Sequence, residues 1–305
     1  MGADCAYKRR DGFTLIELSI VLVIIGLIVG GILVGQSLIS AAGVRAQVTQ
    51  IEKYNTAANT FREKYGYLPG DIPPAQVTQF GFTVVPTRAG TQGRGDGNGV
   101  IEGYNYQGAE IFDISTSGET AFFWEDLSAN SHLIEGTFSA AVDAEESTNT
   151  ALLIPQAKLG NGNFVYVYAA NGTNYFGLSN VANTIGAAGV ISATGNSPGL
   201  TVLQAYAIDT KVDDGFPQTG NVKANYQNWN LFASYVNGAV WAAGGGAAGV
   251  SGTAATAGSS TTCYDNSNTS AGTPGVSGAT QHYSIEMNNG ANNNCALSFK
   301  MQAGD

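Results

Sequence analysis

The chain begins with a basic stretch that runs into a long apolar segment. Lys8, Arg9 and Arg10 precede residues 13–35, in which Glu17 is the single charged side chain. As a helix rising 1.5 Å per residue, a segment of this length crosses about 30 Å of hydrocarbon, so it predicts a membrane span. The basic residues favour a cytoplasmic start, so we expect the rest of the chain outside the cytoplasm.

Beyond this span the pattern becomes amphipathic. Apolar residues recur at steps of three and four, which predicts a helix over residues 36–66 with one packed face. Gly66 and the sequence Leu68-Pro69-Gly70-Asp71 should end it. The packed face should hold Val44, Val48, Ile51, Tyr54, Ala58, Phe61 and Tyr65, and the exposed face should hold Gln47, Gln50, Glu52, Lys53, Arg62, Glu63 and Lys64.

The remaining chain reads as short elements separated by turns. Thr116 and Glu119 have the spacing of a capping box, which predicts a helix whose aromatic residues pack in a core. Residues 164–170 and 175–178 are typical of strands, with Asn171-Gly172 as the hairpin turn. Ser197-Pro198 should open a further helix that reaches Lys211. We therefore expect an α+β fold, a long helix laid on an antiparallel sheet with extra helices and a loop-rich C-terminal region.

Composition narrows the classes of function. The net charge is −10 with only 12% charged residues, which argues against nucleic acid binding by the whole molecule. Only His132 and His282 could act as histidine bases, and neither lies in a nucleophile, phosphate-binding or zinc motif. We therefore expect no enzyme. An anchored enzyme with paired carboxylates has no particular pair to support it.

Glu17 needs a partner if it enters the bilayer, because an ionised side chain there is costly. Cleavage after Gly12 would give Phe13 a free α-amine, and Phe13 and Glu17 lie one turn apart on a helix. That amine, from the same or a neighbouring subunit, could neutralise Glu17 and set the stagger between subunits, since buried ion pairs fix register better than they add stability.

Residues 12–17, Gly-Phe-Thr-Leu-Ile-Glu, resemble the processing site of type IV pilins and of the pseudopilins of type II secretion. Asp11 departs from the purely basic leader that is usual in the family. The resemblance implies a prepilin peptidase that cuts after Gly12 and methylates Phe13, with Glu17 guiding assembly. It also implies an inner-membrane assembly platform, the lipid bilayer and other copies or related pilins as partners.

The resemblance implies a leader at residues 1–12, a transmembrane and assembly helix at 13–35, an amphipathic helix at 36–66 and an extracytoplasmic head at 67–305. The function expected is a structural subunit of a surface or periplasmic filament anchored once in the inner membrane. A type II secretion pseudopilin and a signal-anchored adhesin that never polymerises are the alternatives. A cleavable secretory signal fits poorly, because the candidate cleavage site precedes the apolar run, whereas such a signal is cut after it. A plain signal anchor fits the apolar run but leaves Glu17 unexplained.

Four glycines in the span have the spacing of two overlapping G-x-x-x-G motifs, namely Gly26, Gly30, Gly31 and Gly35. Such spacing lets neighbouring helices approach closely in an apolar environment, although glycine is also simply common in membrane helices.

Two cysteines lie in the exported part. Cys263 and Cys295 are expected to pair in an oxidising compartment, whereas Cys5 lies in the leader. The loop between them, 263–295, resembles the receptor- or neighbour-facing region of the family, and it equally fits a staple for a loose tail. Residues 237–262 and 288–294 are of low complexity and are expected on the surface.

Two acidic loops are candidates for calcium. Gly95 to Glu102 is similar to a pattern in some pilin-like proteins, as is the stretch from Ala207 to Gly215, and both offer oxygen ligands. Arg94 stands where an EF-hand needs its first carboxylate, and turn chemistry is the favoured explanation of both loops. We expect no cofactor, with calcium as the alternative; its candidate ligands are Asp96, Asn98, Glu102, Asp209, Asp213 and Asp214.

Overall fold

The computed structural model of the chain divides into two compact units, Met1–Gly43 and Val44–Asp305. It describes residues 14–82, 88–91, 93–104, 110–111, 118–140, 150–170, 172–181, 196–197, 199–224, 263–265, 282–285, 287–293 and 295–304. Gly12 and Phe13, and the low-complexity segment 237–262, lie outside these ranges.

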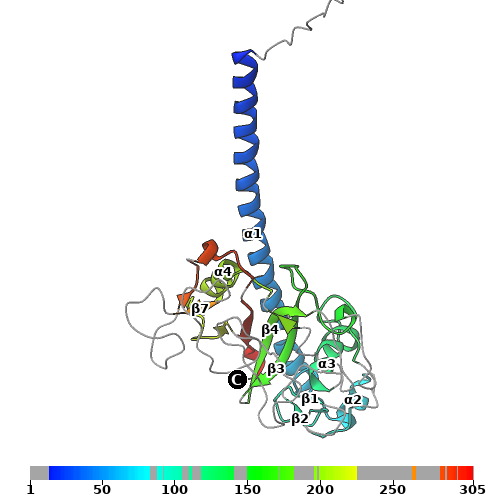
Figure 1. The fold of residues 1–305 in the computed structure, drawn as a ribbon. Helices are drawn as coiled ribbons and strands as arrows, with labels where there is room; N and C mark the ends of the chain where they lie inside the picture. The colour runs from blue at the N-terminus through cyan, green and yellow to red at the C-terminus, as the bar shows by residue number, and fades with distance from the viewer. Residues whose placement is uncertain are drawn as a thin grey trace, which may run out of the picture. The chain divides into compact units, whose positions relative to one another are not determined.

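The described elements confirm an α+β fold, drawn in Figure 1. The α-helices are α1 (Leu15–Tyr65), α2 (Pro74–Phe80), α3 (Glu119–Glu125) and α4 (Val202–Val212). The strands are β1 (Gly103–Tyr104), β2 (Glu110–Ile111), β3 (Asn163–Ala170), β4 (Thr173–Val181), β5 (Asn196–Ser197), β6 (Val222–Lys223), β7 (Tyr264–Asp265), β8 (His282–Tyr283) and β9 (Leu297–Lys300). Four short helical segments are η1 (Asp126–Asn130), η2 (Thr150–Leu152), η3 (Met287–Gly290) and η4 (Gln302–Gly304).

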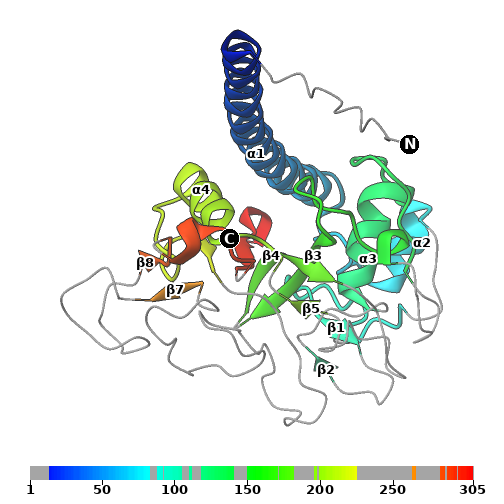
Figure 2. The same cartoon turned by 45° about the horizontal axis from the view of Figure 1, so that its top comes forward.

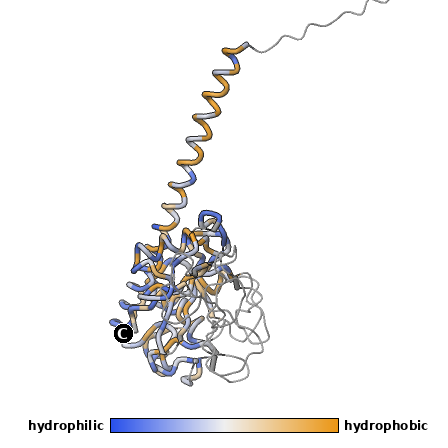
Figure 3. The backbone as a smooth tube through the Cα atoms, turned by 60° about the vertical axis from the view of Figure 1, so that its left-hand side comes forward, coloured by the Kyte–Doolittle hydropathy of each residue, from blue (hydrophilic) through white to orange (hydrophobic). Residues whose placement is uncertain are grey.

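The first unit contains the apolar part of α1. Every large apolar side chain from Leu15 to Ile39 is exposed. Figure 3 shows this run of hydrophobic residues along the helix. Among the described residues, α1 is the one helix long and apolar enough to cross a membrane.

The second unit is built on an antiparallel sheet in which β3, β4, β9 and β6 follow one another, with β5 also paired to β4 (Figure 2). β3 and β4 form the predicted hairpin, with Tyr166 opposite Gly177 in the register. A Cβ at Gly177 would lie 2.0 Å from the Tyr166 ring, so this position requires glycine. The last strand, β9, lies between β4 and β6 in this sheet, and Val222 in β6 pairs with Phe299 in β9.

The Val44–Tyr65 part of α1 contributes to the core of this unit. Tyr54 places its ring 4.9 Å from Trp124 and 6.3 Å from Phe176 of β4, so helix, α3 and sheet share one apolar cluster. Gly66, at φ 81°, follows the last helical residue as predicted.

The predicted exposed face of this helix was wrong at two positions, because Gln47 and Gln50 are buried. Gln47 Oε1 accepts from Leu159 N at 3.3 Å, and Gln50 Oε1 accepts from Lys158 N at 3.0 Å. Two amide side chains thus satisfy the backbone of the loop that leads into β3. Polarity alone does not separate such residues from solvent-facing ones.

Two predicted helix starts also differ. The helix predicted from Ser197-Pro198 begins at Val202, because Thr201 accepts from Gln204 N and forms a capping box with that residue, while Ser197 belongs to β5. The helix predicted from Thr116 begins at Glu119 after Gly118. Thr116 lies outside the described residues, and the Glu119 carboxylate bonds to two distant backbone amides.

Candidate functional site

The start of α1 is organised by Thr14 and Glu17. Glu17 Oε2 accepts from Thr14 N and from Thr14 Oγ1, both at 2.8 Å, and Glu17 N donates to Thr14 Oγ1 at 3.3 Å. This reciprocal pattern is a capping box. The one carboxylate of the apolar segment therefore has hydrogen-bond partners within its own chain.

Sequence analysis missed Thr14, although the Thr-x-x-Glu spacing was visible. Other hydroxyls in the span are satisfied in a similar way. Ser19 Oγ donates to the Ile16 carbonyl at 2.9 Å and Ser37 Oγ donates to the Val34 carbonyl at 2.8 Å. The polar side chains of this helix thus fit an apolar surrounding, in which an unbonded polar group is costly.

The four candidate packing glycines all lie on the exposed part of α1. No heavy atom lies within 4 Å of a Cβ built at Gly26, Gly30, Gly31 or Gly35, apart from the helix's own backbone. Their backbone is therefore open to the approach of another helix.

Cys263 and Cys295 are joined by a disulfide across a separation of 32 residues, with their Cα atoms 5.0 Å apart. Both cysteines are buried. Cys295 also forms a β-bridge with Leu200, just before α4, and the Cys263 carbonyl accepts from Ser284 N. The bond therefore ties β7 and its surroundings to the segment that leads into β9.

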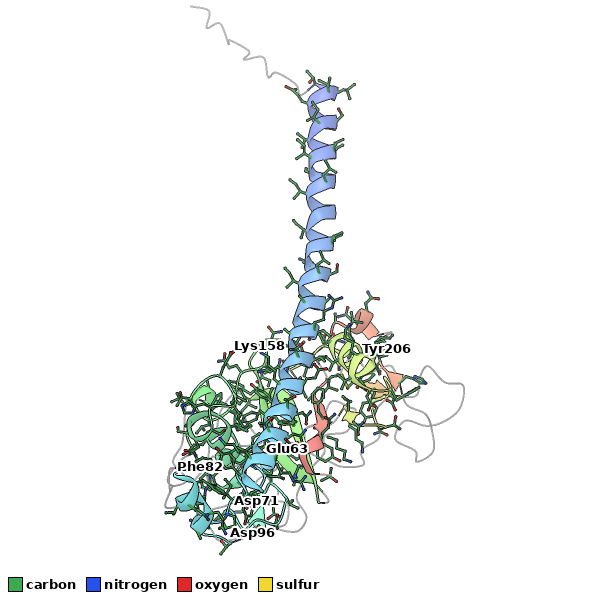
Figure 4. The ribbon with its side chains drawn as sticks, turned by 180° about the vertical axis from the view of Figure 1, so that it is seen from behind. Glu63, Asp71, Phe82, Asp96, Lys158 and Tyr206 are labelled. Carbon is green, nitrogen blue, oxygen red and sulfur yellow. A yellow bond between two sulfur atoms is a disulfide. The ribbon has the colours of Figure 1, made fainter. Side chains whose placement is uncertain are left out.

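The first acidic loop forms a cluster that only partly matches the predicted one. Asp96 lies with Asp71 and Glu119, and one oxygen of each is within 4.8 Å of the others. Figure 4 shows Asp71 and Asp96 close together. Sequence analysis missed Asp71 and Glu119 as members of this cluster; Asp71 lies 24 residues before Gly95, and Glu119 lies 17 residues after Glu102.

Both oxygens of Asp71 and of Glu119 already have donors. Asp71 accepts from Gly97 N at 2.6 Å and Gly99 N at 2.7 Å. Glu119 accepts from Gly95 N at 2.8 Å and Glu102 N at 2.9 Å. Burial raises the pKa of Asp71 to about 7 and, together with the charge of Asp71, that of Glu119 to about 9. These carboxylates brace the loop between Gly95 and Glu102.

The other predicted ligands of this loop also make backbone contacts. Asn98 Oδ1 accepts from Val100 N at 2.6 Å, while Asn98 Nδ2 donates to Asp96 Oδ2 at 3.1 Å. Glu102 is buried, and its backbone N–H is the one that donates to Glu119.

The second acidic cluster brings Asp209, Asp213 and Asp214 together as predicted, with one oxygen of each within 4.8 Å of the others. Asp209 is buried at the end of α4 and accepts from Tyr283 Oη at 2.7 Å and Gly215 N at 3.2 Å. Burial raises its pKa to about 7.

Asp213 and Asp214 take part in the turns that follow. Asp213 Oδ2 accepts from the backbone amides of Asn221 and Val222, the latter at 3.0 Å. Asp214 accepts from Phe216 N at 2.9 Å and Thr219 Oγ1 at 2.6 Å. These are the side-chain to backbone bonds by which aspartate organises turns.

A buried ion pair was not visible in the sequence. Arg88 Nη2 lies 3.0 Å from Asp126 Oδ1, and both side chains are fully buried. Asp126 also accepts from Gly70 N at 2.8 Å, and the Arg88 guanidinium lies 4.5 Å above the Phe122 ring. The pair fixes the segment after α1 against η1.

Of the candidate sites, the start of α1 is the one that a family model recognises. The model is described as the prokaryotic N-terminal methylation motif, and it matches residues 7–33. No curated protein and no solved structure matches the chain. The apolar start of α1, headed by Thr14 and Glu17, therefore matches the prokaryotic N-terminal methylation motif, which supports the resemblance to type IV pilins and pseudopilins.

Proposed function

We propose that this chain is a structural subunit of a type IV pilus-like filament and that it carries out no covalent chemistry. The observation that carries the proposal is the methylation motif at residues 7–33, in which one capped carboxylate heads a helix of exposed apolar side chains. A helix of this kind can be held by lipid or by equivalent helices of other subunits.

In this proposal a prepilin peptidase cuts after Gly12 and methylates the new amino group of Phe13. The amine of one subunit then meets Glu17 of another in the apolar interior of the filament. Neutralisation of both charges fixes the axial stagger, and the exposed glycines of α1 let the helices approach closely. The chain crosses the inner membrane once before assembly, with its head outside the cytoplasm.

The test compares Glu17→Ala with Ser19→Ala in the full chain. Ser19 is the matched control, because it lies in the same segment and bonds only to the Ile16 carbonyl. We expect Glu17→Ala to remain in the membrane fraction but to lose at least tenfold in sheared filaments, and Ser19→Ala to retain them. Equal yields of filaments that contain the chain would reject the proposed role of Glu17 in assembly, and absence of the chain from filaments in both variants would favour a non-polymerising anchored protein.

Cleavage is tested separately by N-terminal sequencing of the native protein. The proposal expects a start at Phe13, and a start at Met1 would contradict it.

The methylation motif is also typical of type II secretion pseudopilins, so these remain the second candidate. Electron microscopy of sheared surface material, with mass spectrometry for this chain, separates the two. Long surface filaments that contain the chain support a pilus. Absence of such filaments, in a strain whose secretion of folded proteins depends on this chain, supports a pseudopilus.

A further inference from the structure

Helix α4 exposes apolar side chains on the face that points away from the core. Leu203 and Tyr206 lie one turn apart and are 51% and 38% exposed. A surface helix normally carries polar residues on that face. The opposite face is the packed one, with Val202, Ala205 and Ile208 buried.

A third exposed apolar side chain belongs to the segment that follows β8, the strand that packs on α4. Ile285, 39% exposed, follows β8, and its backbone N–H donates to the Tyr283 carbonyl at 2.8 Å. The Tyr283 ring lies 5.9 Å from the ring of Tyr206. We call Leu203, Tyr206 and Ile285 the apolar rim.

The rim lies at the end of the second unit where α1 enters it. Lys158 N donates to Gln50 Oε1, so its loop rests on the first turns of α1 within this unit. In Figure 4 Lys158 and Tyr206 lie at the same level along α1, on either side of it. Figures 1 and 2 place α4 at this same end.

The stretch of chain between the exposed apolar segment of α1 and this end of the unit is short. Ile39 is the last large exposed apolar residue of α1, and Val44 is the first buried one. Five helical residues rise about 7.5 Å, which is close to the thickness of one headgroup layer. Arg45 and Lys158 are exposed at the same end and offer positive charge to anionic headgroups.

We propose that the apolar rim docks on the headgroup layer of the bilayer that holds α1. Tyrosine favours this layer because its ring is apolar and its hydroxyl is polar, and Leu203 and Ile285 add apolar area beside it. The head of an unassembled subunit then lies on the membrane surface, and it leaves that surface when α1 enters a filament. The inference rests on the proposed membrane anchor.

The test uses the full chain in vesicles that contain phosphatidylglycerol, with Cys5→Ser so that a nitroxide label reacts only with a new cysteine. Labels are placed by Leu203→Cys in the rim, by Glu63→Cys at an exposed site near the end of α1, and by Ile25→Cys in the anchor. The measurement is the ratio of relaxation by oxygen, which enters lipid, to relaxation by a water-soluble nickel chelate.

We expect the ratio at position 203 to exceed that at position 63 at least threefold. If the oxygen-to-nickel relaxation ratio at position 203 equals that at position 63, while the ratio at position 25 is high as expected in lipid, the rim proposal alone is overturned. A low ratio at position 25, as expected for a label in water, would overturn the proposed membrane anchor itself. Shielding at 203 that disappears when the protein is diluted in lipid would assign the rim to a second copy and also overturn the proposal.

Discussion

The buried pair of Arg88 and Asp126 gives a quantitative prediction for the head. Asp126 Oδ1 accepts from Arg88 and from Asn130 Nδ2, and Oδ2 accepts from Arg88 and from Gly70 N. In Asp126→Asn, either orientation of the amide points an NH₂ group at one of these donors. The substitution also leaves the Arg88 guanidinium buried without a counter-charge.

The magnitude follows from these losses. Removal of one partner from a buried ion pair costs about 3–5 kcal/mol, because the remaining charge stays uncompensated. We expect Asp126→Asn to lower the free energy of unfolding by an amount in this range. With a urea dependence of about 3 kcal/mol per M, the midpoint of unfolding should drop by about 1–1.7 M.

The assay is urea unfolding of the full chain in detergent, followed by tryptophan fluorescence, since buried Trp124 lies two residues from Asp126. Glu63→Gln, at an exposed site, is the control and should change stability by less than about 0.5 kcal/mol. A loss below about 1 kcal/mol for Asp126→Asn would refute the reasoning, because the pair would then be solvated or unnecessary.

Three further outcomes are expected. Replacement of Cys263 and Cys295 by serine should lower the free energy of unfolding by about 3–4 kcal/mol in the same urea assay, because the disulfide closes a loop of 32 residues in the unfolded chain. An unchanged midpoint of unfolding would contradict this stabilising role of the disulfide. The pKa of Asp209 is raised by burial to about 7 from an unfolded value near 4, so stability should fall as pH rises from about 4 to about 7; Asp209→Asn should flatten this part of the profile, and an unaltered slope would exclude Asp209 as its source. Equilibrium dialysis at millimolar calcium should show no bound ion, because both oxygens of Asp71 and of Glu119 already accept backbone N–H groups; one ion per chain that is lost in Asp71→Asn would overturn this expectation.

Local patterns predicted the elements well where one signal dominates. The hairpin of β3 and β4 follows from two segments typical of strands and a glycine turn between them, and the end of α1 follows from Gly66. The Thr14–Glu17 pair combines a capping signal with a charge in an apolar run, so the methylation motif could be recognised from a few residues.

Contacts between distant segments could not be predicted in the same way. Gln47 and Gln50 look like surface residues, yet they satisfy a loop more than a hundred residues away. Glu119 looks like a helix cap, yet its carboxylate bonds to Gly95 and Glu102. In each case a polar side chain compensates buried backbone groups, and only the tertiary arrangement identifies which groups these are.

The hydrogen bonds between Thr14 and Glu17 have a consequence for the supply of subunits. The Glu17 carboxylate already accepts two hydrogen bonds from Thr14 of its own chain, so it has partners in an apolar environment before a second chain supplies one. In the proposed function, single chains can therefore stay dispersed in the membrane before a filament recruits them.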